Sequence, residues 1–265
     1  MSPVLAPAQV RALHALRTAC PDLRCVLVGA AALGFHLPLP RSTADIDLAM
    51  LVAPDDLDEL LVPMGWVRDP RMLQRWRAPD GVLADVLPMS DALLRAGELR
   101  FGGDDFVMSL VGFDLAIEHT ALVPLADTGV DIEIASLSAL VVLKLVAWLD
   151  RPYERTKDLA DLAHILAHAL PADDERRWDP EHPVFLSGLD HEFQSAFFIG
   201  GEIAGIAKPL HHRAFAQFFG RMSAPNGIDF GLLLRETRDI GHDRETRMEQ
   251  RLAAFRQGLD SKRTG

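Results

Sequence analysis

Two aspartates separated by one apolar residue, Asp45 and Asp47 around Ile46, are the residues whose spacing most suggests chemistry. Side chains alternate between the two faces of a strand, so both carboxylates would lie on one face and Ile46 on the other. Two divalent cations roughly 3.5 to 4 Å apart need several oxygen ligands on one face. The pair predicts part of a magnesium site, although alternating acids on a solvated strand explain the spacing equally well.

A third acid, Asp85, lies in the otherwise apolar run 81–89. A lone carboxylate in such a run is unfavourable unless it is paired or bound to a metal. If this run is a neighbouring strand, Asp85 completes the ligand set. We therefore predict Asp45, Asp47 and Asp85 as the catalytic and metal-binding residues.

A small-residue turn precedes the first two acids. The apolar run Val26-Leu27-Val28 predicts a buried strand that ends at Gly29 and Ala30, where a helix can begin. The exposed N–H groups and the positive end of such a helix suit a triphosphate. An ordinary strand-to-helix turn is the alternative.

These motifs together resemble a known signature. Residues 26–50, VLVGAAALGFHLPLPRSTADIDLAM, resemble the polymerase-β-like nucleotidyltransferase superfamily, in which a Gly-Gly or Gly-Ser turn precedes an Asp-x-Asp strand. The string from Arg41 through Thr43 to Asp45-Ile46-Asp47-Leu48 is similar to the AbiEii/AbiGii-type abortive-infection toxins of type IV toxin-antitoxin systems. Ala30 departs from the Gly or Ser usual in the turn.

A second hallmark of that family is a lysine-bearing helix followed by a basic residue and an aspartate. It corresponds here to Lys144 and to Lys157-Asp158 with Asp161. Pairing of Lys144 with Asp158 or Asp161 is the alternative to a phosphate contact, and Arg41 and Thr43 could simply order their loop. The nucleotide-binding residues that the resemblance implies are Gly29, Ala30, Arg41, Thr43, Lys144, Asp158 and Asp161.

The resemblance also implies a reaction. An enzyme of this type moves NMP from an NTP substrate to an acceptor hydroxyl, releases pyrophosphate and uses two Mg²⁺ ions, with Mn²⁺ as a substitute. The toxin resemblance implies RNA, tRNA in particular, as the acceptor and a cognate antitoxin as a partner. Two alternatives stay open: nucleotidylation of a small molecule such as an aminoglycoside or of a protein hydroxyl, and a nucleotide-binding pseudoenzyme.

The order of the remaining patterns predicts an α+β fold, with a small mixed sheet flanked by helices and then a C-terminal helical domain. We expect a catalytic domain over 1–135, a lysine-bearing helical segment over 136–170 and a helical domain over 171–265. Ser90 and Ser136 are expected to cap helices. The polar, proline-bearing stretch 171–183 is interpreted as a linker. Further strands are expected at 24–28, 45–52, 106–111 and 130–134, and helices at 7–18, 30–35, 54–61, 136–150, 157–170, 193–219 and 232–259.

Composition narrows the class of partner. The net charge of −11 argues against a broad nucleic-acid surface, yet it suits an enzyme whose carboxylates hold a metal.

The longest apolar run, 140–149, is interrupted by Lys144 and is shorter than the roughly 20 residues of a membrane helix. With no secretory pattern and only Cys20 and Cys25 as thiols, we expect a cytoplasmic protein with reduced cysteines and no membrane partner.

The histidines and phenylalanines are weaker candidates. His164 and His168 have a spacing that can bind zinc, but no third ligand is evident. The pair His211-His212 fits a solvated turn or an acceptor contact. The phenylalanines between 193 and 219 have helical spacing and are expected in the core.

Overall fold

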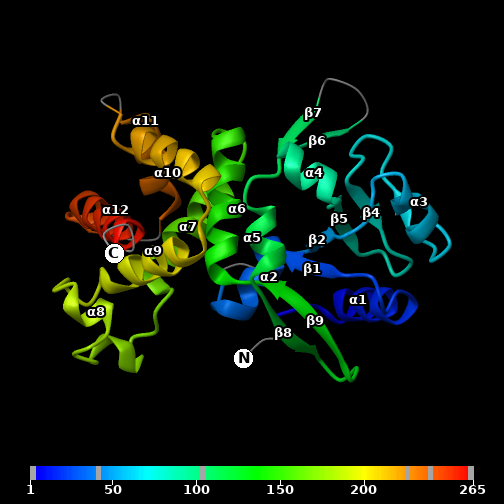
Figure 1. Ribbon diagram of the computed structural model, residues 1–265, viewed down its shortest axis with the longest axis horizontal. Coiled ribbons are helices and arrows are strands. Elements are labelled where there is room, and N and C mark those ends of the chain that lie inside the picture. Colours follow the sequence, from blue (N-terminus) through cyan, green and yellow to red (C-terminus); the bar gives the residue numbers. More distant parts are fainter. Residues whose placement is uncertain (1–3, 40–42, 102–105, 225–226, 238–240, 262–265) are drawn as a thin grey trace. The chain divides into compact units, whose positions relative to one another are not determined.

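The computed structural model describes residues 4–39, 43–101, 106–224, 227–237 and 241–261, and Figure 1 shows their helices and strands. The chain packs as two compact units, Met1–Leu140 and Val141–Gly265. The first holds a mixed sheet flanked by helices and the second is helical, which confirms the predicted α+β class. The division at residues 135 and 170 stays a prediction. In the described part of the chain, no helix is long and apolar enough to cross a membrane.

Seven strands form the mixed sheet, in the order β3-β4-β5-β2-β1-β9-β8. β2 runs parallel to β5 and β1 runs parallel to β9, whereas the other neighbouring strands are antiparallel. The strands are β1 (Cys25–Val28), β2 (Asp45–Met50), β3 (Val67–Arg68), β4 (Arg75–Arg77), β5 (Leu83–Pro88), β8 (Thr120–Leu125) and β9 (Val130–Ala135).

One face of the central strands forms the core of this unit. Trp76, Ala84 and Ile46 occupy neighbouring register positions on β4, β5 and β2, and all three are fully buried. Because side chains alternate along a strand, the residues between them point to the opposite face. Burial of Ile46 therefore directs Asp45 and Asp47 to the other side of the sheet, as predicted.

Helices of the first unit lie against this sheet (Figure 1). α2 packs on β1 and β2, and α5 contacts β1. The predicted cap at Ser90 is confirmed, since the Leu93 N–H donates to the Ser90 hydroxyl oxygen at 3.3 Å. β6 and β7 form a separate antiparallel pair. The elements are α1 (Pro7–Ala19), α2 (Gly29–His36), α3 (Asp56–Leu61), α4 (Asp91–Ala96), β6 (Glu98–Phe101), β7 (Phe106–Ser109) and α5 (Phe113–Glu118).

The second unit is a packed set of helices. α9 and α12 approach each other closely because Gly200 and Gly258 lie at their contact, where a Cβ would collide with the facing backbone. The predicted cap at Ser136 is confirmed by the Ala139 N–H, which donates to its hydroxyl at 3.3 Å. The helices are α6 (Leu137–Asp150), which begins in the first unit, α7 (Thr156–His168), α8 (Pro183–Leu186), α9 (Gln194–Ile206), α10 (Pro209–Met222), α11 (Ile228–Glu236) and α12 (Arg244–Asp260).

The interpretation of 171–183 as a linker is wrong. The segment contains the short 3-10 helix η1 (Glu175–Arg177), and the Arg177 side chain is buried. Its guanidinium donates to the Pro171 carbonyl at 2.6 Å, the His191 carbonyl at 2.8 Å and the Gln194 side chain at 3.0 Å. Burial lowers the pKa of Arg177, and these acceptors compensate for the lost hydration. A polar segment is therefore packed into the unit by one arginine.

Candidate functional site

The structure brings the three predicted acids together on one face of the sheet. Asp47 on β2 and Asp85 on β5 are register partners, so their side chains share a face. Asp45 is two residues before Asp47 on the same strand and points the same way. All three side chains are partly accessible, as a ligand site requires.

Gly29 places the backbone directly beside this face. It lies at the start of α2 with a φ of +66°, a conformation that L side chains rarely adopt. A Cβ at this position would overlap the Asp47 carboxylate. The predicted turn therefore abuts the predicted acids, and Gly29 is required both by its backbone conformation and by the close approach of Asp47.

Thr43 contacts Asp45 through its hydroxyl group. The hydroxyl donates to the Asp45 carboxylate at 2.9 Å, with the Asp45 carbonyl oxygen 3.2 Å away. The Gln9 side-chain amide donates to the Thr43 carbonyl at 3.2 Å and so holds the preceding loop. Thr43 orders the entry to β2 and orients one acid, while Arg41, predicted beside it, lies outside the described residues.

Arg75 is the site residue that sequence reasoning missed. It is the register partner of Asp85 on β4, and its guanidinium makes a two-pronged contact with that carboxylate, Nε to Oδ1 at 2.8 Å and Nη2 to Oδ2 at 2.9 Å. The same Nη2 is 3.5 Å from Asp45 Oδ2. The signal that could have found it is the alternation Arg75-Trp76-Arg77, in which a buried tryptophan forces both arginines to the opposite face.

The charges of this face act on one another. The hydrogen bond to Asp85 is the largest influence on the pKa of Arg75 and raises it, burial opposes this, and the charges of Asp85, Asp45 and Asp47 raise it further. A guanidinium among three carboxylates offsets the repulsion that would otherwise separate them. The face is therefore a network of four charged side chains.

The donor types fit a divalent cation, but their arrangement does not present a finished site. Carboxylate oxygens are the ligands that Mg²⁺ prefers, and Asp45 and Asp47 supply them beside Gly29. Both oxygens of Asp85 are engaged by Arg75. Accordingly, no set of three His, Cys, Asp or Glu side chains among the described residues is already arranged to hold a metal.

The second predicted group, Lys144 with Asp158 and Asp161, forms an ion cluster inside the helical unit. Lys144 Nζ is 2.6 Å from Asp161 Oδ2 and 3.3 Å from Asp158 Oδ1. The side chains of Lys144, Asp161 and Asp158 are only 6%, 4% and 13% exposed. The internal pairing that was open as an alternative is therefore present, and a phosphate contact by Lys144 stays a prediction.

The weaker candidates have structural surroundings. His211 is buried, and its Nδ1 accepts from the Lys208 N–H at 2.9 Å at the start of α10. The rings of His164 and His168 on α7 have centroids 4.7 Å apart and are tilted by 52°, with no third metal ligand beside them in the described part of the chain. Burial raises the pKa of the Cys25 thiol to about 12, so it stays protonated at neutral pH.

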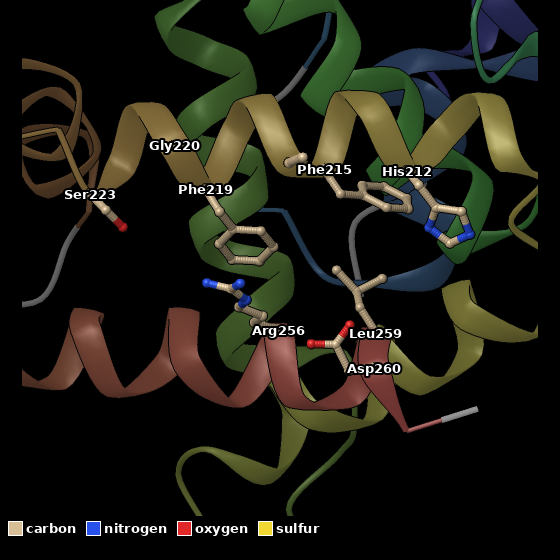
Figure 2. A pocket seen from close by; sticks show the side chains of 9 residues that line it. His212, Phe215, Phe219, Gly220, Ser223, Arg256, Leu259 and Asp260 are labelled. Atoms are coloured by element: carbon tan, nitrogen blue, oxygen red, sulfur yellow. The ribbon is translucent and has the colours of Figure 1, made fainter. Parts of the chain in front are cut away.

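A cavity of about 350 Å³ lies in the helical unit between α10 and α12. Figure 2 shows His212, Phe215 and Phe219 of α10 facing Arg256, Leu259 and Asp260 of α12. Phe215 is buried, as the core prediction requires, and the Arg256 guanidinium carbon is 5.7 Å from the centre of the Phe219 ring. The phenylalanines therefore serve mainly as core, with two of them also lining this cavity.

Comparison with known proteins finds distant similarities to solved structures. No family model matches the chain, and no curated protein matches it in sequence. The antibiotic-resistance factor ANT(2'')-Ia is similar with 16% identity, a TM-score of 0.39 and coverage of 84% of this chain and 97% of that one. An antigenic nucleotidyltransferase-like protein from Paracoccidioides brasiliensis is similar with 16% identity, a TM-score of 0.40 and coverage of 68% of this chain and 85% of that one. JHP933 from Helicobacter pylori is similar with 13% identity, a TM-score of 0.38 and coverage of 96% of this chain and 91% of that one. Similarity at this level carries no conclusion about the family, the activity or the substrate of this chain.

Proposed function

We propose that this chain is a divalent-cation-dependent nucleotidyltransferase with Asp45, Asp47 and Asp85 at its active site. The observation that carries the proposal is the register of Asp47 with Asp85 on adjacent parallel strands, with Asp45 on the same face. Gly29 supports it, because its backbone lies where only a residue without a side chain can approach Asp47. A purely structural strand pair has no need for three acids on one face.

The acids divide the chemistry between them. Asp45 and Asp47 would hold two Mg²⁺ ions, which would supply charge stabilisation at the phosphates and a lower pKa for the acceptor hydroxyl. The acceptor oxygen forms a bond to the α-phosphorus, the bond from that phosphorus to the bridging oxygen of the β-phosphate breaks, and pyrophosphate leaves. Asp85, once Arg75 no longer engages both its oxygens, would ligate the second cation and also take the hydroxyl proton.

The turn at Gly29 and Ala30 binds the triphosphate in this proposal. N–H groups in the first turn of a helix have no partner within the helix and favour anions. Thr43 acts indirectly by orienting Asp45, with which it shares a hydrogen bond.

RNA, tRNA in particular, is the acceptor we propose, on the resemblance of the segment around Asp45 to the AbiEii/AbiGii-type toxins, with an antitoxin as partner. A second acceptor class follows from the charge of the chain. Its net charge of −11 favours a small cationic acceptor such as an aminoglycoside over a polyanion.

Label transfer tests the proposal. The purified chain is incubated with Mg²⁺ and each α-labelled NTP in turn, with total tRNA, a bacterial protein extract or an aminoglycoside panel as acceptor. Asp45→Ala/Asp47→Ala is the inactive variant, and Asp131→Ala is the matched control because Asp131 is an exposed acid on β9 of the same sheet. We expect label in one pool, retained by the control, lost with EDTA and lost in the double variant.

The opposite results separate the alternatives. Label transfer that survives in the double variant contradicts the assignment of the acids. Absence of transfer combined with a nucleotide-induced rise in melting temperature indicates a nucleotide-binding protein or an acceptor outside the three pools, because a ligand that binds only the folded state must raise its stability. Absence of both label transfer and a nucleotide-induced rise in melting temperature would show that the chain has no nucleotide site.

A further inference from the structure

Arg75 holds the acid on which the proposed site depends. Its guanidinium engages both oxygens of Asp85, at 2.8 and 2.9 Å, and reaches Asp45 at 3.5 Å. This two-pronged geometry gives the strongest form of an arginine-carboxylate contact. The arginine therefore lies where a cation shared by Asp45 and Asp85 would also have to lie.

The pair is open enough to exchange partners. The side chains of Arg75, Asp85 and Asp45 are 24%, 21% and 41% exposed. Solvent can therefore take over the hydrogen bonds that either group loses. Because neither charged group is sealed from water, a more highly charged cation can displace the guanidinium without leaving it buried and unpaired.

We infer that Arg75 is a resident counter-ion that competes with the divalent cation for Asp85, so that the cation binds completely only when the guanidinium leaves that carboxylate. The inference rests on the metal site in the proposed function. Arg75 is thus a positioning residue, which keeps the three acids together until a cation replaces it.

A second consequence concerns Asp85 itself. In the wild type, the free energy that the cation gains by binding Asp85 is offset by the free energy needed to displace Arg75 from the same carboxylate. Asp85 therefore contributes little to the net affinity for the cation. Without Arg75, the whole contribution of Asp85 becomes visible. The two residues are therefore expected to be strongly non-additive in metal binding.

Direct titration of Mn²⁺ without nucleotide, followed by electron paramagnetic resonance, measures this competition. Arg75→Gln is expected to bind Mn²⁺ at least about tenfold more tightly than the wild type, because a positive charge a few ångströms from the cation is removed. Arg75→Lys keeps the charge but cannot hold both oxygens, so an intermediate affinity is expected. Asp85→Asn should weaken binding much more in the Arg75→Gln background than in the wild type.

Arg24→Gln is the matched control. Arg24 contacts Glu133 through Nε and Nη2 at 2.9 to 3.2 Å, and its side chain is 40% exposed. It precedes β1 at the end opposite Val28, the register partner of Asp47. Its removal takes away one positive charge from the same sheet without touching the acids, so Mn²⁺ affinity should not change.

The outcomes are distinct from those of the activity assay. Arg75→Gln binding no tighter than the wild type, with Mn²⁺ binding still dependent on Asp45 and Asp47, overturns this inference and leaves the proposed function standing. Mn²⁺ binding that is unaffected by Asp45→Ala/Asp47→Ala overturns both. Should Arg75→Gln melt below the assay temperature, Arg75→Lys decides the question by the same criterion.

Discussion

Two clusters in this molecule each place one basic side chain within 4 Å of two aspartates, but their surroundings are opposite. On the sheet, Arg75, Asp85 and Asp45 come from three strands and are 24%, 21% and 41% exposed. In the helical unit, Lys144 of α6 meets Asp161 and Asp158 of α7, and the three side chains are 6%, 4% and 13% exposed. The difference in exposure predicts that the first cluster can exchange its cation and that the second cannot.

The physical reason is desolvation. An ammonium ion and a carboxylate that are removed from water each lose hydration, and an oppositely charged partner must compensate for that loss. Lys144 and Asp161 are therefore committed to each other, whereas Arg75 and Asp85 can each turn to water or to a new ion. Sequence resemblance alone placed Lys144 at a phosphate, and its burial with two acids indicates that structural stabilisation is the first demand on this lysine.

The largest effect that would separate the clusters is expected from Lys144→Met. It removes the ammonium group 2.6 Å from the buried Asp161 carboxylate, and breaking a buried ion pair costs about 3 to 5 kcal/mol in the free energy of unfolding. Urea denaturation measures the loss, and Lys157→Met, which removes an exposed lysine from α7, is the control with little effect. Adding Asp161→Leu to Lys144→Met should recover much of the loss. A loss below about 1 kcal/mol, typical of surface pairs, would erase the distinction between the clusters.

A smaller effect is expected from Gly29→Ala beside the open cluster. A left-handed backbone costs a non-glycine residue about 1 to 2 kcal/mol, and the new Cβ also pushes the Asp47 carboxylate away. We expect a matching fall in urea stability together with weaker Mn²⁺ binding.

Gly97→Ala isolates the second part of that effect. Gly97 has a φ of +72° at the end of α4, but a Cβ there meets nothing within 4 Å. It should lose similar stability and keep full Mn²⁺ affinity. Equal Mn²⁺ affinity in both variants would show that the close approach of Gly29 to Asp47 has no role in the site.

Periodicity predicted the parts of the site that lie on well-patterned strands. Asp45 and Asp47 alternate with buried Ile46, and Asp85 interrupts an apolar run, so their faces follow from burial alone. The register that joins Asp47 to Asp85 does not follow from sequence, because strand pairing is a tertiary choice. Arg75 was missed because β4 is only three residues long, so the alternation around Trp76 was the sole local signal of a strand there.

Other errors have similar causes. No strand was predicted at β8, which contains Pro124, because proline argues against a strand. β8 is the edge strand of the sheet, where a missing backbone N–H can be tolerated. The stretch 171–183 is polar and proline-bearing and looks like a linker. Its packing depends on Arg177 reaching the carbonyl of His191, fourteen positions along the chain, which no local pattern reveals.

The smallest effect tests whether the sheet unit has a protonation response of its own, apart from the acids. Burial lowers the pKa of His36, whose Nε2 lies 2.8 Å from the Ala135 carbonyl. The pKa of His36 in the folded state lies below its unfolded value of about 6.5. Between these two pKa values the unfolded state binds more protons than the folded state, so the free energy of unfolding falls as the pH falls from about 6.5 toward the folded-state pKa. Comparing urea midpoints at pH 7 and pH 5, we expect the wild type to lose more stability than His36→Gln, whose amide can still donate to Ala135. The same loss in both proteins would assign the acid sensitivity elsewhere, with His168 of the helical unit, whose pKa burial also lowers, as the next residue to replace.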